Sequence, residues 1–435
     1  MSNDLFSMTA VQIAADISSG KLTAEAVMLD HIARINVRDS AVNAFLDFDA
    51  DRALRLARAS DRQTEKGVLH GVPFAVKDII DTVDLPTSWG SSIYKGFQTP
   101  RSASCVEMLV RAGAIPIGKT VTTEFAYFSP GATRNPHNLG HTPGGSSSGS
   151  AAAVADGMAV LGLGSQTAAS LTRPAAYCGV FGYKASQGSI DLQGVMGLAA
   201  SLDTLGLLAR GIDDLILARA ALCGTVLPSE DQGHCVPQKI AFLKGPHWQE
   251  TSHSMKDTCV AAAEALASAG ASVTDLQCPP EFNQLSECHK TIMAFEVARA
   301  RHFEFRNHPK QLSCAFYSLI ETGLSTSRAD YDAAMAARDT GEAVLANLLS
   351  CYDFIMTPAA PSAAPAGIEA TGDPVFSRLW TVMRVPTVTL PFGRDAANLP
   401  LAFQLVGGFS ADQKLLAHSR QIADILQISC AIPGL

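Results

Sequence analysis

Hydrophobic residues recur along this chain with two spacings, one typical of helices and the other of buried strands. In the segment 9–18, Val11, Ala14 and Ile17 fall on one helical face, and Gly20 follows as a helix-ending residue. Short continuous apolar runs, such as 158–163, are typical of strands that are buried on both faces. The pattern predicts helices at 9–18, 23–35, 49–65, 102–112, 148–155, 254–269 and 411–426, and strands at 72–76, 114–117, 158–163, 240–243, 272–276, 353–356, 385–390 and 401–406.

The order of these elements predicts the fold class. Strands that alternate with helices indicate an α/β protein, in which a mixed, mostly parallel twisted sheet is covered by helices on both faces. No internal repeat and no clear linker divides the 435 residues, so we expect a single large domain. Within it, the segment 225–352 is expected to be a mainly helical elaboration, and 361–372 is expected to be a loop rich in Pro, Ala and Gly.

Composition and charge exclude several classes of protein. The chain is 47% hydrophobic and only 17% charged, which predicts a large buried core. Its net charge of −8 comes without a basic cluster, so we expect neither a nucleic-acid nor a membrane partner. The start of the sequence has no basic and apolar signal-peptide pattern, and the longest apolar stretch, 151–164, is too short to span a bilayer.

Cysteines and histidines follow no metal-binding pattern. The ten cysteines form no C-x-x-C pair, which is typical of reduced thiols in a cytoplasmic protein. His137 and His141 are four residues apart, but the Pro and Gly residues around them predict a loop. We therefore expect a cytoplasmic protein without a metal site.

The segment 113–120 matches the phosphate-loop pattern G-x-x-x-x-G-K-[ST] at every position. That pattern requires a strand before Gly113 and a helix that opens at Lys119, whereas here a helix ends at Gly113 and the strand falls inside the supposed loop. Pro116 also removes an N–H group that would contact phosphate. We therefore favour a helix C-cap at Gly113 followed by a core strand.

A second motif, G-S-S-S-G at 145–149, fits the nucleophile elbow G-x-S-x-G with Ser147 as the nucleophile. An elbow follows a hydrophobic strand, but the preceding segment, 135–143, is rich in loop-forming residues. His418, the histidine that could complete a triad, lies in the predicted terminal helix. These features argue against an elbow.

An isolated lysine, Lys77, stands in apolar surroundings. The strand 72–76 precedes it, and Ile79 and Ile80 follow. Burial removes the hydration of an ammonium group, so the pKa falls and the free amine becomes available as a base. Strand alternation sends Asp78 to the opposite face, where its charge affects Lys77 less.

Two serines lie in tight turns rich in Gly, Ala and Ser. Ser146 is in P-G-G-S-S-S-G-S at 143–150, and Ser170 follows 24 residues later in T-A-A-S. A serine hydroxyl is a poor nucleophile at neutral pH unless a base lies within reach. One amine and two hydroxyls are therefore the groups needed for acyl transfer without histidine.

In these residues the chain resembles the amidase signature family. Lys77 in G-V-P-F-A-V-K-D, Ser146 in the serine-rich tract and Ser170, with R-P-A-A shortly after it, stand where the family places them. The resemblance covers 69–206, the expected signature core, and is weaker in F-I-M-T-P at 354–358. It implies one amidase signature domain over 1–435 and assigns 113–120 to an ordinary helix-to-strand passage.

The resemblance also implies a mechanism. Neutral Lys77 accepts a proton from Ser146, which is held by a cis peptide bond, and Ser146 accepts one from Ser170. The Ser170 oxygen then attacks the amide carbonyl, and water later hydrolyses the acyl-enzyme. The oxyanion is bound by backbone N–H groups of the turn that leads to Ser170, namely those of Gln166, Thr167, Ala168 and Ala169. This chemistry needs no metal and no organic cofactor.

Two departures from the family's common text bear on activity. Where the family commonly has D-T-G-G-S, this chain has Q-T-A-A-S, and Ala168 or Ala169 would strain the turn if its position were left-handed. Arg173 stands one residue later than the common arginine, in an order similar to the malonamidase branch, which acts on small carboxylated amides. Arg173 could bind a substrate carboxylate with two N–H groups or could be structural, and both alternatives stay open.

The sequence thus predicts a hydrolase that cleaves the C–N bond of a small linear amide to carboxylate and ammonia. A monoamide of a short dicarboxylic acid is one candidate for this small-molecule substrate, and a homodimer is one option for the assembly. Two alternatives retain the fold: an amidotransferase subunit that supplies ammonia to a partner, and a catalytically impaired relative that binds ligand.

Overall fold

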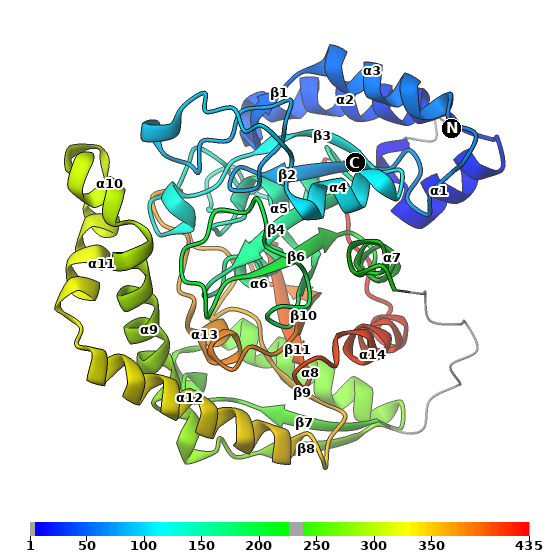
Figure 1. The fold of residues 1–435 in the computed structure, drawn as a ribbon. Coiled ribbons are helices and arrows are strands. Elements are labelled where there is room, and N and C mark those ends of the chain that lie inside the picture. The colour runs from blue at the N-terminus through cyan, green and yellow to red at the C-terminus, as the bar shows by residue number, and fades with distance from the viewer. Residues whose placement is uncertain (1–4, 226–237, 435) are drawn as a thin grey trace.

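A single eleven-stranded sheet runs through the molecule, which is described by a computed structural model for residues 5–225 and 238–434 (Figure 1). The strand order is β1-β3-β2-β4-β6-β5-β10-β11-β9-β7-β8. The strands are β1 (Phe45–Phe48), β2 (Pro73–Lys77), β3 (Ile115–Thr120), β4 (Leu161–Gln166), β5 (Phe181–Lys184), β6 (Thr204–Ala209), β7 (Lys239–Leu243), β8 (Ser272–Leu276), β9 (Phe354–Pro358), β10 (Thr387–Arg394) and β11 (Pro400–Val406).

The sheet is mixed, as expected, but the expectation that it is mostly parallel is wrong. Of the ten pairings between described strands, six are antiparallel and four are parallel. The antiparallel pairs include β5 with β6 and β10 with β11. Each of these two pairs is joined by a connection without an α-helix, 185–203 and 395–399, and so lacks the helical crossover usual between parallel neighbours.

Helices cover both faces of the sheet, as predicted. On β5, a Cβ atom added to Gly182 would lie 2.6 Å from Ala175 of α6, whereas the next residue, Tyr183, hydrogen-bonds Asp412 of α14. Successive strand residues point to opposite faces, so α6 and α14 lie on different sides. The helices are α1 (Ala10–Ser18), α2 (Ala24–Val42), α3 (Ala50–Asp61), α4 (Ser104–Arg111), α5 (Ser148–Ala155), α6 (Thr172–Cys178), α7 (Ile212–Cys223), α8 (His253–Ser268), α9 (Leu285–Ala300), α10 (His302–Asn307), α11 (Cys314–Ser325), α12 (Arg328–Leu348), α13 (Val375–Val382) and α14 (Asp412–Ile425).

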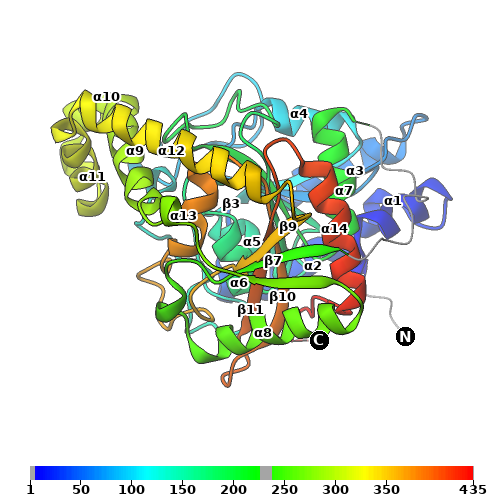
Figure 2. The same cartoon turned by 90° about the horizontal axis from the view of Figure 1, so that it is seen from below.

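Helices α9 to α12 form an arc along one side of the molecule, away from α1, and Figure 2 shows the same separation from below. They belong to the segment 225–352 that the sequence marks as mainly helical, of which 226–237 lie outside the described residues. The same segment also supplies β7 and β8, which extend the sheet at one edge. Helix α9 packs against α11, α12 and α13, so the arc is joined to an element that follows β9.

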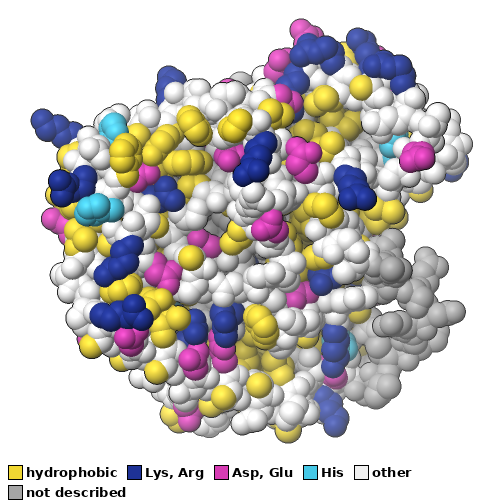
Figure 3. Space-filling model, in the orientation of Figure 1, with side chains coloured by type: hydrophobic (Ala, Val, Ile, Leu, Met, Phe, Trp, Pro, Cys, Tyr) yellow, Lys and Arg dark blue, Asp and Glu magenta, His cyan; other side chains and the backbone are white. Residues whose placement is uncertain are grey.

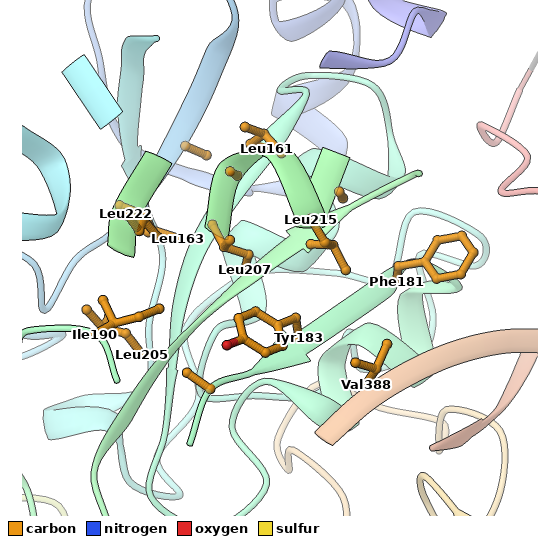
Figure 4. Close-up of a cluster of buried hydrophobic side chains, with 14 of the residues drawn as sticks. Leu161, Leu163, Phe181, Tyr183, Ile190, Leu205, Leu207, Leu215, Leu222 and Val388 are labelled. Carbon is orange, nitrogen blue, oxygen red and sulfur yellow. The ribbon is translucent and has the colours of Figure 1, made fainter. Parts of the chain in front are cut away.

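The centre of the sheet is filled by aliphatic side chains. Leu163 of β4 lies beside Leu207 of β6, Leu161 and Leu205 lie on the same two strands, and all four are almost fully buried (Figure 4). Tyr183 of β5 belongs to the same core cluster. Strands β4 and β6 carry the segments that lead to the site, so this packing fixes their ends.

Helix starts follow the sequence signals closely. Thr9 caps α1 in a capping box with Gln12, and Thr23 caps α2, which continues to Val42, beyond the expected end. Helix α5 has the predicted bounds, 148–155. The elements without a sequence prediction are β1, β5, β6, α6, α7 and α13.

The phosphate-loop match at 113–120 has the structure of a helix-to-strand passage. Helix α4 ends at Arg111, Gly113 has φ of +94°, and β3 begins at Ile115. Lys119 is fully buried within β3 and donates to the Ile80 carbonyl and the Thr87 hydroxyl. Its side chain therefore serves the core and is not available to a nucleotide.

Among the described residues, no helix is both long and apolar enough to cross a bilayer. The nine cysteines in the described part of the chain are free thiols, and Cys235 lies outside it.

The glycine at the start of α5 allows the serine-rich tract to approach neighbouring backbone. A Cβ atom added to Gly149 would lie 2.2 Å from the Ala44 carbonyl oxygen and 2.5 Å from the Val121 nitrogen. Because both neighbours are backbone atoms, we expect Gly149→Ala to lower the free energy of unfolding by about 3 kcal/mol. Urea unfolding measures this loss. Gly408→Ala is the matched control, since its Cβ would meet only ordinary contacts, and equal stability of the two variants would contradict the prediction.

Candidate active site

Lys77 is the last residue of β2 and is fully buried. Its Nζ donates to the Ser146 hydroxyl at 2.6 Å and to the Ser165 hydroxyl at 2.8 Å. Burial lowers the pKa of Lys77 to about 7, while the charge of Asp203 acts in the opposite direction. The carboxylate of Asp78 lies 3.7 Å from Nζ of Lys119, so its charge is directed away from Lys77, as expected.

Ser146 lies in the loop that leads into α5, and the Gly145–Ser146 peptide bond is cis. Gly144 before it has φ of +80°, and a Cβ there would lie 2.9 Å from Cα of Pro174 in α6. The loop therefore packs directly against the helix that follows Ser170, and a side chain at position 144 would separate them.

Ser147, the residue of the nucleophile-elbow alternative, faces inward. It is fully buried, and its hydroxyl donates to the Ser165 carbonyl and accepts from the Ser165 N–H, both at 3.3 Å. No strand precedes it, because 135–147 is a loop. His418 on α14 lies beside Gln238 and Asp353 instead.

Ser170 occupies the turn between β4 and α6 and lines a cavity of about 20 Å³ together with Ser146. A cavity of this size holds about one water molecule. The structure thus brings Lys77 and Ser146 into hydrogen-bond contact and places Ser146 and Ser170 on one small cavity. The three residues predicted from sequence therefore meet at one place.

The turn before Ser170 presents unused backbone donors. Among the described residues, the N–H groups of Ala168, Ala169 and Ser170 donate to no other protein group. Neither Ala168 nor Ala169 is among the described residues with positive φ, so the replacement of glycine does not strain this turn. Adjacent free N–H groups beside a serine hydroxyl can bind an oxyanion. Of the other two predicted donors, the Thr167 N–H also has no protein partner among the described residues, whereas Gln166 belongs to β4.

The side chain of Gln166 has a role that the sequence analysis missed. Its Oε1 accepts from the N–H groups of Leu171 and Thr172, each at 3.0 Å, and so caps α6, whose N-cap residue supplies no side-chain bond. Its Nε2 donates to the hydroxyl of Thr381 on α13, and that hydroxyl donates to the Ala168 carbonyl. These contacts fix both ends of the turn.

Thr167 is held from two sides by residues that lie far away in the sequence. Its hydroxyl donates to Asp203 at 2.5 Å, and its carbonyl accepts from Nε2 of His289, on α9, at 2.6 Å. Burial lowers the pKa of His289 to about 3, so the ring is neutral at pH 7, and Nε2–H is the donor to the carbonyl. Sequence reasoning gave no signal for Ser165, Asp203 or His289, because none lies in a recognisable motif.

Arg173 is buried at the start of α6, and its Nη groups are occupied. They donate to the carbonyls of Gly145 and Gly372 at 2.7 and 2.6 Å and to the hydroxyl of Thr371 at 2.9 Å. Burial lowers the pKa of Arg173 to about 10. Its Nε is buried and has no protein partner among the described residues, and the side chain lines the Ser170 cavity. The guanidinium therefore ties the Ser146 loop to 371–372 with three of its five N–H groups, and Nε–H is among those left for a ligand.

The rest of this cavity is mostly apolar. Its walls include Tyr127, Phe128, Leu198, Met293 and Pro374. Met293 lies one helical turn after His289 on α9, so the same helix supports the turn before Ser170 and lines the cavity.

The chain belongs to the amidase family, whose model matches residues 26–416. It is 30% identical to the A subunit of glutamyl-tRNA(Gln) amidotransferase from Lachnospira eligens, over 93% of this chain and 95% of that protein. It is also 30% identical to the corresponding protein of Gloeobacter violaceus, over 94% and 95% of the two chains. Members of this family act on C–N bonds, and the chain is accordingly an enzyme of the amidase type.

Solved structures show the same fold. A crystal structure described as an amidase has a TM-score of 0.87 and 26% identity over 96% of this chain and all of that one. A protein from a vestigial complex connected with the origin of an s-triazine catabolic enzyme has a TM-score of 0.88 and 26% identity, over 97% and 99%. The peptide amidase of Stenotrophomonas maltophilia, at 24% identity over 98% of each chain and a TM-score of 0.83, shares the fold. The relatives found do not single out the malonamidase branch.

We expect amide hydrolysis to follow the titration of Lys77. With a pKa of about 7, the amine that accepts a proton predominates above that pH, so kcat/KM should fall about tenfold per pH unit below it and level off above it. Asp203→Asn removes a charge that favours the ammonium, which lowers this pKa further and moves the acidic limb to lower pH. Profiles of kcat/KM against pH measure both effects. The exposed Asp51→Asn is the control, and an unmoved limb in Asp203→Asn would contradict the assignment.

We predict that His289 positions the nucleophile turn. Phe in its place removes the donor to the Thr167 carbonyl, and a shift of the turn of about 1 Å can lower kcat by about 100-fold with little change in KM. Gln retains a donor at similar reach, so His289→Gln should recover most of the lost kcat. Steady-state kinetics of both variants, with thermal unfolding as the check on folding, test this. Equal kcat in the parent and His289→Phe would exclude the role.

Proposed function

We propose that this enzyme hydrolyses small linear amides to carboxylate and ammonia through an acyl-enzyme on Ser170. One observation carries the proposal: a fully buried lysine, with its pKa lowered to about 7, hydrogen-bonds Ser146 at 2.6 Å. Ser146 in turn shares a cavity with Ser170 and its free backbone donors. A poor nucleophile thereby has a base within reach through one hydroxyl.

In the first half of the reaction, neutral Lys77 takes the proton of Ser146, Ser146 takes that of Ser170, and the Ser170 oxygen bonds to the amide carbon. The N–H groups of Ala168, Ala169 and Ser170 stabilise the oxyanion. The lysine ammonium then returns its proton through Ser146 to the nitrogen, the C–N bond breaks, and ammonia leaves.

In the second half, water attacks the Ser170 ester and loses a proton through the same route. The ester C–O bond breaks, Ser170 regains a proton, and the carboxylic acid product leaves and ionises to the carboxylate, giving its proton to the released ammonia. Because one amine serves as base and acid in both halves, Lys77 ends each cycle in the state in which it began. The proposed steps use no metal and no organic cofactor.

The cavity supports a short acyl group. Its volume of about 20 Å³, room for about one water molecule, argues against a long acyl chain, and the apolar walls formed by Tyr127, Phe128 and Met293 favour a small apolar group. A monoamide of a short dicarboxylic acid remains a candidate substrate, with Arg173 Nε–H donating a hydrogen bond to its carboxylate. The occupied Nη groups argue against the bidentate contact expected for that ligand, so neutral amides are the better supported substrates.

A second candidate function is that of an amidotransferase component that supplies ammonia to a partner. The relatives at 30% identity favour it, since they are A subunits of glutamyl-tRNA(Gln) amidotransferase. On the face shown in Figure 3, Lys and Arg side chains are interspersed with Asp and Glu side chains over the described residues, which offers little support for contact with RNA. A catalytically impaired relative is the less supported alternative, because Ala168 and Ala169 do not strain the turn.

Ammonia release from a series of amides tests the proposal. The purified chain should hydrolyse short neutral amides such as propionamide, and Ser170→Ala should lower kcat by at least ~10⁴-fold while the fold is retained. Thr172→Ala, a neighbouring hydroxyl that is buried away from the cavity lining, is the matched control. Retained turnover in Ser170→Ala would place the nucleophile elsewhere. Turnover that requires a partner protein and tRNA would favour the amidotransferase function.

A further inference from the structure

A second cavity, of about 230 Å³, borders the first and has no role in the steps above. It lies between the end of β4, the start of β6 and the loop 192–203. Ala126, Thr167 and Leu198 line both cavities, so the two share one wall. Gly197 and Ala200 at its rim are exposed, so this cavity reaches the surface.

Its lining combines an apolar wall with a polar floor. Ile79, Leu192, Val195 and Met196 form much of the wall, and the floor includes Ser165, whose hydroxyl accepts from Lys77 at 2.8 Å. The second cavity therefore reaches the second hydrogen-bond partner of Lys77, whereas Arg173 lines only the first cavity.

Asp203 gives this cavity a negative charge. Its carboxylate accepts from the Thr167 hydroxyl and from the N–H groups of Leu198 and Ala199, at 2.5, 2.7 and 3.0 Å, and all three donors are uncharged. Burial raises its pKa to about 6, which leaves it mostly ionised at pH 7. A buried carboxylate without a bonded cation favours a cationic ligand nearby.

In the proposed reaction, the acyl half and the amine half of the amide lie on different sides of Ser170. The acyl half occupies the cavity lined by Arg173 and Met293, and the nitrogen takes its proton from Ser146, which is bonded to Lys77. Lys77 also bonds Ser165, which lines the second cavity, so this cavity is the neighbouring space open to a substituent on that nitrogen.

We propose that the second cavity is a leaving-group subsite that takes the alkylamine half of an N-substituted amide. The inference rests on the proposed function and narrows its substrate class from simple amides to secondary amides with an apolar N-substituent. In that reaction R–CO–NH–R′ and water give R–COO⁻ and R′–NH₃⁺; the C–N bond breaks as before, and the amine takes the proton passed on by Ser146. The alkyl chain lies against the apolar wall, and the ammonium product lies near Asp203.

A pair of substrates with one acyl group tests the subsite. The parent should hydrolyse N-butylpropionamide with a kcat/KM at least about tenfold above that for propionamide. Val195→Trp fills the cavity from a half-exposed loop position and should lower that ratio by at least about tenfold. Val37→Trp, at a position that is 73% exposed on α2, is the matched control and should keep the parent ratio. A parent that prefers propionamide, or a ratio unchanged by Val195→Trp, would overturn the inference.

Binding of butylammonium to Ser170→Ala tests the subsite without turnover. Calorimetry should give a Kd in the millimolar range, weaker binding of 1-butanol, and loss of butylammonium binding when Val195→Trp is added. If the parent hydrolyses no amide while butylammonium binds in this way, the proposed function fails and the amine subsite stands. If amides are hydrolysed but butylammonium does not bind, the subsite is wrong and the proposed function stands.

Discussion

The burial of one ammonium-forming group is the constraint on which this site depends. Lys77 stands inside the sheet with no exposed surface, and within the described part of the chain its Nζ hydrogen-bonds only hydroxyl oxygens. An ammonium in such a place loses hydration that two neutral acceptors only partly replace. The neutral amine is favoured as a result, and the nearby charge of Asp203 limits how far that preference goes. The two opposing effects place the titration near neutral pH, where a general base and acid works best.

The second requirement is a rigid turn before Ser170, and the chain meets it with contacts from distant segments. Gln166 caps α6 and bonds Thr381, Asp203 holds the Thr167 hydroxyl, and His289 holds the Thr167 carbonyl. These contacts use side chains, the Thr167 carbonyl and the two N–H groups capped by Gln166, and they leave the N–H groups of Ala168, Ala169 and Ser170 available. The preorganisation of backbone donors toward a developing charge is usually the largest single contribution to such catalysis. The helical arc thus supports the turn before Ser170 as well as lining the cavity.

Much of the fold was predictable because it depends on local periodicity and caps. Thr9, Thr23 and the apolar strand before Lys77 specify their elements without help from distant contacts. Strands β5 and β6 were not predicted. For β5, the reason is that 181–184 is short and contains Gly182, which faces α6. The direction of strand pairing also escaped prediction, since it is set by connections such as 185–203 whose path the local sequence does not specify.

The residues of the site also fall into a predictable group and an unpredictable one. Lys77, Ser146 and Ser170 were found because motif and spacing mark them, whereas His289 and Asp203 act through single contacts across 122 and 36 residues of sequence. Such contacts leave no periodic or compositional trace. Arg173 could be named from the sequence, but only the structure shows that its Nη groups bond carbonyls of both the Ser146 loop and residue 372.

The contacts of Thr371 and Thr381 also determine the stage of chain synthesis at which the site can form. All three residues of the proposed relay are synthesised early, yet the arginine that braces the Ser146 loop and the glutamine that caps α6 bind partners that emerge some 200 residues later. Strand β10, which pairs directly with β5, is later still. A nascent chain on the ribosome therefore carries the chemical groups without the scaffold that aligns them, and the site can form only after the segment with Thr371, Thr381 and β10 has been synthesised.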